Sequence, residues 1–221
     1  MKAVKKVVIL GTGGNSIDIL EAINELNSHE AKTLYECSGF LDDNQSLWGN
    51  TVQGLKVLGP LSHAAQLSGF YFVNGIGAPS NFWKKELIVS STGVSQDRFE
   101  TIIHPSSSIS QSAHIDQGTV IFQNVTITSN VRIGRHVIVL PHTVISHDVI
   151  IGDYTCITGG VCVSGGVSIG RSCYLGSNCT INGNVHIGDH SLIGMGGVVL
   201  EHIPGNSIFV GNPARFLRRT I

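Results

Sequence analysis

The feature that most constrains the fold is a six-residue repeat that runs from Ile109 to Val199 without an insertion. Every sixth residue of this segment is Ile, Leu or Val, and the position two residues earlier is mostly small or apolar. A helix would show a period near 3.6 residues and a half-buried strand a period of about two. A six-residue period with turn residues between the apolar positions is typical of a parallel β-helix, in which stacked units bury their aliphatic side chains together. The segment is therefore predicted to form a β-solenoid around one apolar column.

Charge and composition restrict the function classes. The formal net charge is -1, so nothing favours binding to nucleic acid or to an anionic membrane. No run of about 18 apolar residues exists, so no membrane-spanning helix is predicted. Met1–Lys6 is basic and is not followed by the features of a signal peptide, and the five cysteines form no C-x-x-C pair. We expect a cytoplasmic protein in a reducing compartment, without a metal site.

The first hundred residues follow a different pattern. Val7–Leu10 is predicted to be a buried strand, Gly11–Asn15 a glycine turn, and the following residues a helix with apolar positions from Ile17 to Leu26. This order is the opening of a nucleotide-binding α/β unit, in which the helix N-terminus offers free N–H groups to a phosphate. A small parallel, Rossmann-like sheet is therefore expected. Its further elements are predicted to be strands at 37–41 and 70–74 and a helix at 79–90.

The two patterns meet near His104, so we predict an α/β domain over residues 1–103 and an all-β helix with a C-terminal tail over residues 104–221. The dinucleotide fingerprint G-x-G-x-x-G is incomplete, because Ser16 stands where its third glycine would be. An NAD-linked enzyme is thus disfavoured, and a purely structural turn remains an alternative. Asp42 and Asp43 follow the predicted strand at 37–41, where an acidic residue could bind the ribose of a nucleotide. A solvated turn is the alternative interpretation of this pair. The candidate nucleotide-binding residues are Gly13, Gly14, Asn15, Asp42, Asp43 and Gly77.

The repeat resembles that of the hexapeptide acyltransferases. Nearly the whole chain is similar to the bacterial nucleotide-linked amino-sugar N-acetyltransferases of the bacillosamine pathway, which are grouped with sialic acid O-acetyltransferase-like proteins. The resemblance is carried by Ile9–Asn15, Gly39–Asp43, Ser146–Asp153 and Gly211–Ala214. It implies a left-handed β-helix with three units per coil, hence about five coils here. It also implies a homotrimer and acetyl-CoA as co-substrate.

A histidine beside a carboxylate is the candidate catalytic pair. His147 lies two positions after Ile145, outside the aliphatic column, and Asp148 follows it directly. A carboxylate can hold one imidazole tautomer and stabilise the imidazolium, and free imidazole titrates near pH 6.5, as a general base requires. From the residues alone a surface histidine is the alternative, and His142 is the reserve candidate. The resemblance implies that His147 is the catalytic base.

The resemblance also implies an acetyl-CoA site. Some relatives carry a second histidine nine residues after the catalytic one, and some carry an asparagine seven residues before it; this chain has Cys156 and Leu140 at these positions. An acyl-carrying role for Cys156 is disfavoured, because nothing nearby in sequence would lower the pKa of its thiol. The implied co-substrate-binding residues are Cys156, Gly165, Ser177 and Met195, with the Gly165 N–H as the oxyanion or thioester contact.

The expected function follows from these features and the resemblance together. It is acetyl transfer from acetyl-CoA to the C4 amine of a nucleotide-linked 4-amino-deoxy sugar, for a bacterial surface glycan such as lipopolysaccharide. Residues 1–103 would bind the nucleotide sugar. The alternatives are sugar O-acetylation of the sialic acid type and a non-enzymatic β-solenoid scaffold, because fold alone does not determine function.

Overall fold

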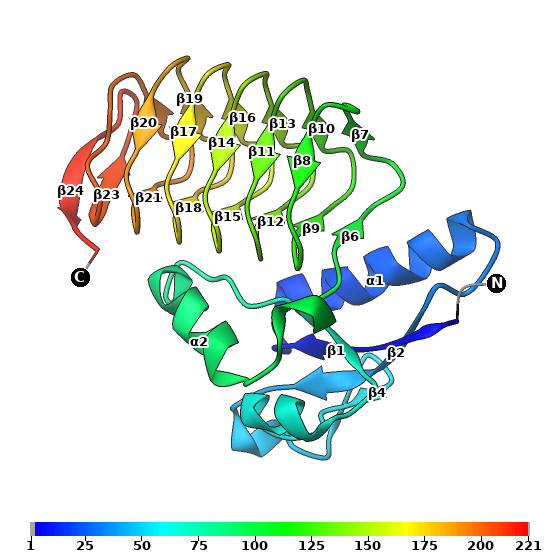
Figure 1. Ribbon diagram of the computed structural model, residues 1–221. Helices are drawn as coiled ribbons and strands as arrows, with labels where there is room; N and C mark the ends of the chain where they lie inside the picture. Colours follow the sequence, from blue (N-terminus) through cyan, green and yellow to red (C-terminus); the bar gives the residue numbers. More distant parts are fainter. Residues whose placement is uncertain (1–2, 221) are drawn as a thin grey trace.

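A computed structural model describes residues 3–220 and shows two domains that pack side by side (Figure 1). The N-terminal domain has a parallel three-stranded sheet in which β1 (Lys5–Leu10) lies between β2 (Tyr35–Leu41) and β5 (Tyr71–Asn74). Its core is formed by the fully buried run Val7–Leu10 and by α1 residues such as Ile19 and Ile23. The main elements are β1 (Lys5–Leu10), α1 (Gly14–His29), β2 (Tyr35–Leu41), β5 (Tyr71–Asn74) and α2 (Lys85–Ser91). The smaller elements are η1 (Gln45–Leu47), β3 (Thr51–Val52), β4 (Leu55–Lys56), η2 (Leu61–Gln66), η3 (Phe82–Lys84) and η4 (Gln96–Arg98).

The second helix starts later than the predicted 79–90. Pro79 lacks an N–H donor, and the side-chain oxygen of Asn81 accepts the N–H of Ala78 at 2.8 Å. These local contacts replace the first helical turn, and the chain passes through η3 before α2 begins at Lys85. The segment from Gly75 to Asn81 is therefore a loop at the edge of the sheet.

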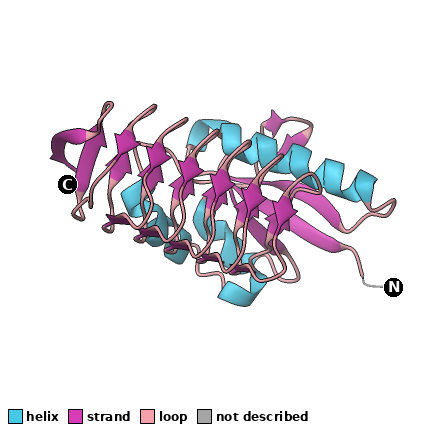
Figure 2. Cartoon of the chain, turned by 90° about the horizontal axis from the view of Figure 1, so that it is seen from above, coloured by secondary structure: helices cyan, strands magenta, loops and turns pink. Residues whose placement is uncertain are grey.

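The rest of the chain is a left-handed parallel β-helix with three flat walls, and its coils follow one another along the long axis of the molecule (Figure 2). Each strand pairs with the strand three units on, as Ile127 pairs with Ile145. Wall 1 contains β6 (Ile102–Ile103), β9 (Val120–Ile121), β12 (Ile138–Val139), β15 (Cys156–Ile157), β18 (Tyr174–Leu175), β21 (Leu192–Ile193) and β23 (Ser207–Val210), with β24 (Arg215–Arg219) antiparallel at its end. Wall 2 contains β7 (Ser108–Ile109), β10 (Thr126–Ile127), β13 (Val144–Ile145), β16 (Cys162–Val163), β19 (Thr180–Ile181) and β22 (Val198–Val199). Wall 3 contains β8 (His114–Ile115), β11 (Arg132–Ile133), β14 (Ile150–Ile151), β17 (Ser168–Ile169) and β20 (His186–Ile187).

The second residue of each two-residue strand points inward and forms the predicted apolar column. Cys173 and Cys179 are fully buried in it, as their repeat position predicts. The helix extends beyond the predicted repeat at both ends, because β6 joins wall 1 before Ile109 and β23 joins it after Val199. In the last coil Ile193 pairs with Phe209, so this coil is two residues shorter than the others. That shortening breaks the six-residue register near Pro204.

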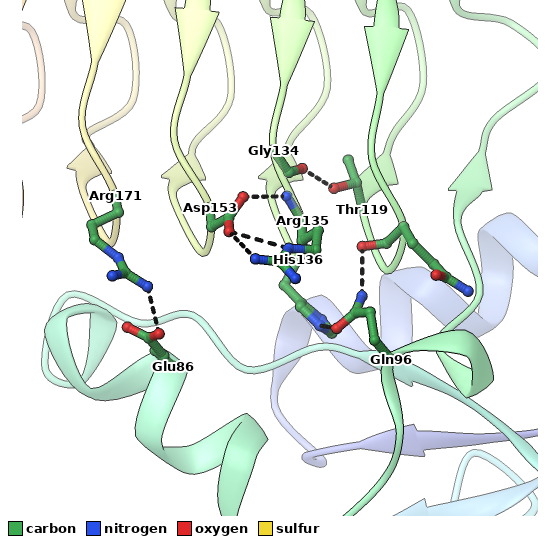
Figure 3. Close-up of polar contacts among 9 residues, drawn as sticks. Glu86, Gln96, Thr119, Gly134, Arg135, His136, Asp153 and Arg171 are labelled. Atoms are coloured by element: carbon green, nitrogen blue, oxygen red, sulfur yellow. Dashed lines mark hydrogen bonds and ion pairs between the residues drawn. The ribbon is translucent and has the colours of Figure 1, made fainter.

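Wall 1 is covered by the N-terminal domain. The outward side chains of Val120 and Ile138 are buried against that domain's core, and Phe82 packs on the Tyr174 ring. Polar contacts border this apolar interface at the corner between walls 3 and 1 (Figure 3). Arg171 pairs with Glu86 of α2, and His136 Nε2 lies 2.9 Å from Gln96 Oε1. The two domains are therefore fixed against each other by an extensive interface.

One residue of this interface makes stability depend on pH. His136 is fully buried, stacks on Tyr154 and packs edge-on against Phe99. Burial lowers the pKa of His136 to about 3, reinforced by the positive charge that Lys85 carries when it is protonated and by that of Arg135. Since the folded pKa lies below the unfolded value of about 6.5, its contribution to stability is complete above that pH and is lost on acidification.

We expect the free energy of unfolding to fall by about 2 kcal/mol from this group alone between pH 7 and pH 5. Urea denaturation at both pH values measures the change, and a His136→Gln variant, which cannot titrate, is the matched control. The variant should show a smaller difference between the two pH values than the wild type. Equal differences would contradict the assignment of this pH dependence to His136.

Candidate active site

A cavity of about 380 Å³ lies at the carboxyl ends of β1 and β5. The glycine turn, the Gly75–Asn81 loop and Tyr174 of β18 line it, so both domains contribute to its walls. It brings together five of the predicted nucleotide-binding residues, namely Gly13, Gly14, Asn15, Asp42 and Gly77. The sixth, Asp43, lines a smaller adjoining cavity together with Asp42 and Asn81. We call the two cavities together the nucleotide pocket.

The pocket contains the N-terminus of α1. Gly13 is the N-cap in an extended conformation, and no side chain caps the helix. The first turn carries no acidic residue, and within residues 3–220 no side chain accepts the N–H groups of Gly14 and Asn15. Free N–H groups and the positive end of the helix dipole favour an anion at this position. The pocket is therefore chemically suited to a phosphate.

The structure also explains the incomplete fingerprint. Ser16 is fully buried, and its hydroxyl donates to the Leu10 carbonyl at 3.3 Å. A Cβ on Gly75 would lie 2.1 Å from Ser16 Oγ. Helix α1 can therefore pack this closely against the sheet only because the residue that follows β5 is a glycine. Gly75 thus supplies the space that the third fingerprint glycine would supply. The local glycine pattern does not reveal this compensation, because Gly75 is far from Ser16 in the chain.

Asp42 and Asp43 are more than a solvated turn. Asp42 Oδ2 accepts two hydrogen bonds from Thr12, one from its backbone N–H at 2.9 Å and one from its side-chain hydroxyl at 2.7 Å. Asp42 Oδ1 accepts a hydrogen bond from the N–H of Asn44 at 2.8 Å. Asp43 Oδ1 accepts the N–H of Leu61 at 2.9 Å. Each carboxylate keeps further lone pairs that a ligand could use. Asp42 therefore holds the glycine turn in shape at the edge of the pocket.

The predicted catalytic pair lies at the corner between walls 2 and 3, opposite wall 1. His147 Nδ1 is 2.8 Å from Asp148 Oδ2, and the carboxylate also accepts a hydrogen bond from Asn130 at 3.1 Å. The hydrogen bond from His147, and secondly that from Asn130, lower the pKa of Asp148. An ionised Asp148 holds the proton on Nδ1, which leaves Nε2 as a free acceptor. With 64% of the His147 side chain exposed, that acceptor is open to a ligand.

Gly165 lies one coil further along the same corner. A Cβ at this position would come within 2.5 Å of His147 Cε1 and 2.6 Å of Nε2, so the imidazole lies directly against the glycine backbone. Among the described residues, none accepts the N–H of Gly165, whereas the N–H of Gly166 donates to the His147 carbonyl at 2.9 Å. A proton acceptor and an unpaired backbone donor therefore lie side by side, as transfer of an acyl group requires.

The structure does not bring the other predicted co-substrate residues to this corner. Ser177 and Met195 lie at the corner between walls 1 and 2, where Met195 is 80% exposed and Ser177 Oγ lies 3.1 Å from Thr158 Oγ1. Cys156 is buried in wall 1 beneath Gly77 and Lys85. The reserve candidate His142 is also at the corner between walls 1 and 2 and is exposed. Within one chain, His147 and the nucleotide pocket are thus on different sides of the β-helix.

Asp148 should matter less than His147. Asn tolerates the left-handed backbone at this position, where φ is 60°, so Asp148→Asn keeps the fold. We expect kcat to fall about 10-fold with little change in KM, because the base survives but loses its orienting charge in a solvent-exposed pair. Steady-state kinetics of acetyl-CoA turnover would measure this. An unchanged kcat, or a loss as large as that of removing His147, would contradict this supporting role.

Known proteins resemble this chain in its repeat and in its fold. The family described as bacterial transferase hexapeptide (six repeats) matches residues 166–201. No curated protein matches the chain in sequence. PerB of Caulobacter crescentus, solved with CoA and GDP-perosamine, has a TM-score of 0.82 and 25% identity, covering 98% of this chain and 99% of that one. The acetyltransferase domain of PglB from Neisseria gonorrhoeae, solved with acetyl coenzyme A, has a TM-score of 0.83 and 25% identity over 97% of this chain and 100% of that one.

WeeI from Acinetobacter baumannii is similar over the same extent, with a TM-score of 0.82, 25% identity and coverage of 97% of this chain and 100% of that chain. The six-residue repeat and the three coiled walls are those of a β-helix transferase. The chain matches the hexapeptide-repeat transferases over residues 166–201, and its similarity to these solved proteins over nearly their whole length indicates an acetyl-CoA-dependent acetyltransferase. The scaffold alternative is therefore set aside.

Two further features of the described chain bear on cofactors and membranes. Across residues 3–220, no three His, Cys, Asp or Glu side chains gather in an arrangement that could hold a metal ion. None of the helices in this range has the length and apolar character needed to cross a membrane.

Proposed function

We propose that the protein transfers the acetyl group of acetyl-CoA to the C4 amine of a nucleotide-linked 4-amino-deoxy sugar. The observation that carries this proposal is the exposed His147–Asp148 pair beside the unpaired Gly165 N–H, in a chain that also has a pocket suited to a nucleotide. The similarity to PerB, which was solved with CoA and GDP-perosamine, supports the substrate class. In this proposal the product serves a bacterial surface glycan such as lipopolysaccharide, and the reaction takes place in the cytoplasm.

The chemistry follows from the two groups at the corner. His147 Nε2 accepts a proton from the amine as the nitrogen attacks the thioester carbonyl, and Asp148 stabilises the resulting imidazolium. The N–H of Gly165 donates to the oxygen that becomes negatively charged in the tetrahedral intermediate. Collapse of the intermediate breaks the carbon–sulfur bond, and the imidazolium returns the proton to the leaving CoA thiolate.

We further propose that the active form is a homotrimer with sites between subunits. The nucleotide pocket faces wall 1, whereas His147 lies at the opposite corner, so a single chain cannot bring base and nucleotide sugar together. Rotation about a three-fold axis would place the His147 corner of one copy beside the nucleotide pocket of the next. In such an arrangement Ser177 and Met195, at the edge of wall 1, border the same groove and contact acetyl-CoA.

Light scattering tests the oligomeric state. We expect a particle of three times the chain mass of 23.5 kDa at assay concentration. The physical reason is that outward apolar side chains on walls 2 and 3, such as Val144 and Ile150, are exposed in the single chain. A stable, catalytically active monomer would contradict the proposal.

The substrate class is tested by the release of free CoA thiol in the presence of a panel of nucleotide sugars. The panel pairs 4-amino sugars with their 4-hydroxy counterparts on UDP, GDP and dTDP, and includes a sialic acid. We expect turnover only with a 4-amino sugar. Turnover with hydroxy sugars alone would indicate the O-acetyltransferase alternative. Titration calorimetry with NAD is the control, and tight NAD binding without a response to any nucleotide sugar would overturn the assignment of the pocket.

A further inference from the structure

A lysine and a cysteine from different domains meet beneath the nucleotide pocket. Lys85, the first residue of α2, is fully buried, and its Nζ lies 3.4 Å from Cys156 Sγ in β15 of wall 1. Neither the proposed acetyl transfer nor the fold accounts for this contact. Within residues 3–220, Lys85 forms no ion pair with a carboxylate, so the sulfur is its polar partner. A fully buried lysine without a carboxylate partner is costly and uncommon.

The surroundings favour the nucleophilic form of the lysine beside the sulfur. Burial lowers the pKa of the Lys85 ammonium group, and the nearby Cys156 offsets only part of this effect. The shift favours the neutral amine, which has the lone pair that a nucleophile needs. The amine nitrogen and the sulfur already lie at contact distance, with no other side chain between them. A sulfur that becomes electrophilic would therefore have an amine nucleophile next to it.

The sulfur lies directly behind the wall of the pocket. Gly77 lines the nucleotide pocket, and a Cβ on Gly77 would lie 2.4 Å from Cys156 Sγ and 3.7 Å from Lys85 Nζ. The absence of a side chain at Gly77 means that the floor of the pocket above the sulfur is only one backbone thick. The pair is thus buried from bulk solvent and separated from the open pocket by the Gly77 backbone alone, which a small oxidant must pass.

The other cysteines lack this combination. Cys173 and Cys179 lie in the apolar column, where burial raises the pKa of each thiol to about 12. Burial also raises the pKa of Cys37 to about 11. Cys162 points outward from wall 2 and is partly exposed, and among the described residues it has no amine neighbour. Cys156 is therefore the cysteine whose oxidation has a specific acceptor.

We propose that Lys85 and Cys156 form a site of covalent modification, in which an oxidant of the peroxide class links Lys85 Nζ to Cys156 Sγ and joins the two domains. The Cys156 sulfur attacks one peroxide oxygen, the O–O bond breaks, and a sulfenic acid and one water are formed. The Lys85 amine then attacks the sulfur, an N–S bond forms, and the hydroxyl leaves as a second water with a proton from the amine. The sulfur is oxidised by two electrons and the peroxide is reduced to two waters, so the linked chain has lost two hydrogen atoms.

The link would fix the loop that lines the pocket. It connects β15 directly to the start of α2, which follows the Gly75–Asn81 loop in the chain. A cross-link between residues 71 positions apart also reduces the conformational entropy of the unfolded chain. We expect the melting temperature of the peroxide-treated protein to rise by about 5–10 °C and to return to its starting value after a thiol reductant.

Peptide mass mapping of the full-length protein tests the proposal. The native protein is treated with hydrogen peroxide, alkylated and digested with trypsin. The expected result is a linked pair of peptides containing Lys85 and Cys156, lighter by two hydrogen atoms than their sum, uncleaved after Lys85 and separated by dithiothreitol. A Cys162→Ser variant should keep the link, whereas Cys156→Ser and Lys85→Met should lose both the link and the rise in melting temperature.

Three results would overturn the proposal, and none requires a variant to fold. In the first, Cys156 stays unmodified at a peroxide concentration that oxidises Cys162. In the second, Cys156 is oxidised but the Lys85 amine remains free. In the third, the linked product retains the peroxide oxygen.

Discussion

Replacing His147 by alanine is expected to lower kcat by about 10²–10⁴-fold, the usual contribution of a positioned general base. The His147 side chain is 64% exposed and lies outside the apolar column, so the fold and the affinity for the nucleotide sugar should change little. The defect should shrink at high pH, where the amine loses its proton more readily to solvent. Steady-state kinetics as a function of pH would measure both effects.

His142→Ala is the matched control for this substitution. His142 is an exposed turn residue of the same type at the neighbouring corner, and no glycine backbone donor equivalent to Gly165 lies against its ring among the described contacts. Its replacement should leave kcat within about two-fold of the wild type, as for most surface substitutions. A folded His147→Ala protein with normal turnover at pH 7, together with an inactive His142→Ala protein, would reverse the assignment.

Gly165→Ala is expected to lower kcat by about 10²-fold, because a displacement of about 1 Å at a catalytic group has costs of this size. The added Cβ would lie 2.5 Å from the His147 ring, so the imidazole must move away from its position beside the Gly165 N–H. Gly165 does not have a positive φ, so the backbone itself accepts alanine. The expected outcome is a low kcat in a protein with wild-type thermal stability.

Gly159→Ala separates this effect from a general intolerance of side chains at the corners. Gly159 is a turn residue one corner away, and the nearest atom to its added Cβ is the Pro141 carbonyl oxygen at 3.4 Å, an ordinary contact. This variant should keep near-normal kcat. A Gly165→Ala enzyme as active as Gly159→Ala would mean that the observed position of the imidazole is not the one used in catalysis.

Most of the β-helix could be predicted from the sequence, because each unit repeats the same local requirement for an inward aliphatic side chain. The ends could not, for a physical reason. Ile103 keeps the register but precedes the segment in which turn residues repeat, and the last coil is two residues short, so Phe209 falls outside the six-residue count. A solenoid tolerates such a change at its end, since only one neighbouring coil must match it.

The candidate site divides in the same way. His147 and Asp148 are adjacent in the chain, so their hydrogen bond was predictable from sequence. The packing of Ser16 against Gly75 depends on how two elements meet, and a local glycine motif cannot show it. The position of Cys156 is the clearest example, because its partner Lys85 comes from another domain 71 residues away. Contacts of this kind become visible only in the folded molecule.

The most direct test of the account is whether two inactive variants restore each other's activity in mixed trimers. His147→Ala removes the base, and Gly14→Glu places a carboxylate at the N-terminus of α1, where nothing lies within 4 Å of the added Cβ and a phosphate would be repelled. Both homotrimers should be inactive with the acceptor identified in the nucleotide-sugar panel. Differently tagged chains allow the mixed trimers to be isolated and their composition to be checked by mass.

If the base of one subunit acts on the substrate held by its neighbour, isolated mixed trimers should regain about a third of wild-type activity, since in either mixed composition one of the three sites combines an intact base with an intact neighbouring pocket. Mixed trimers of confirmed composition that remain inactive would contradict the account.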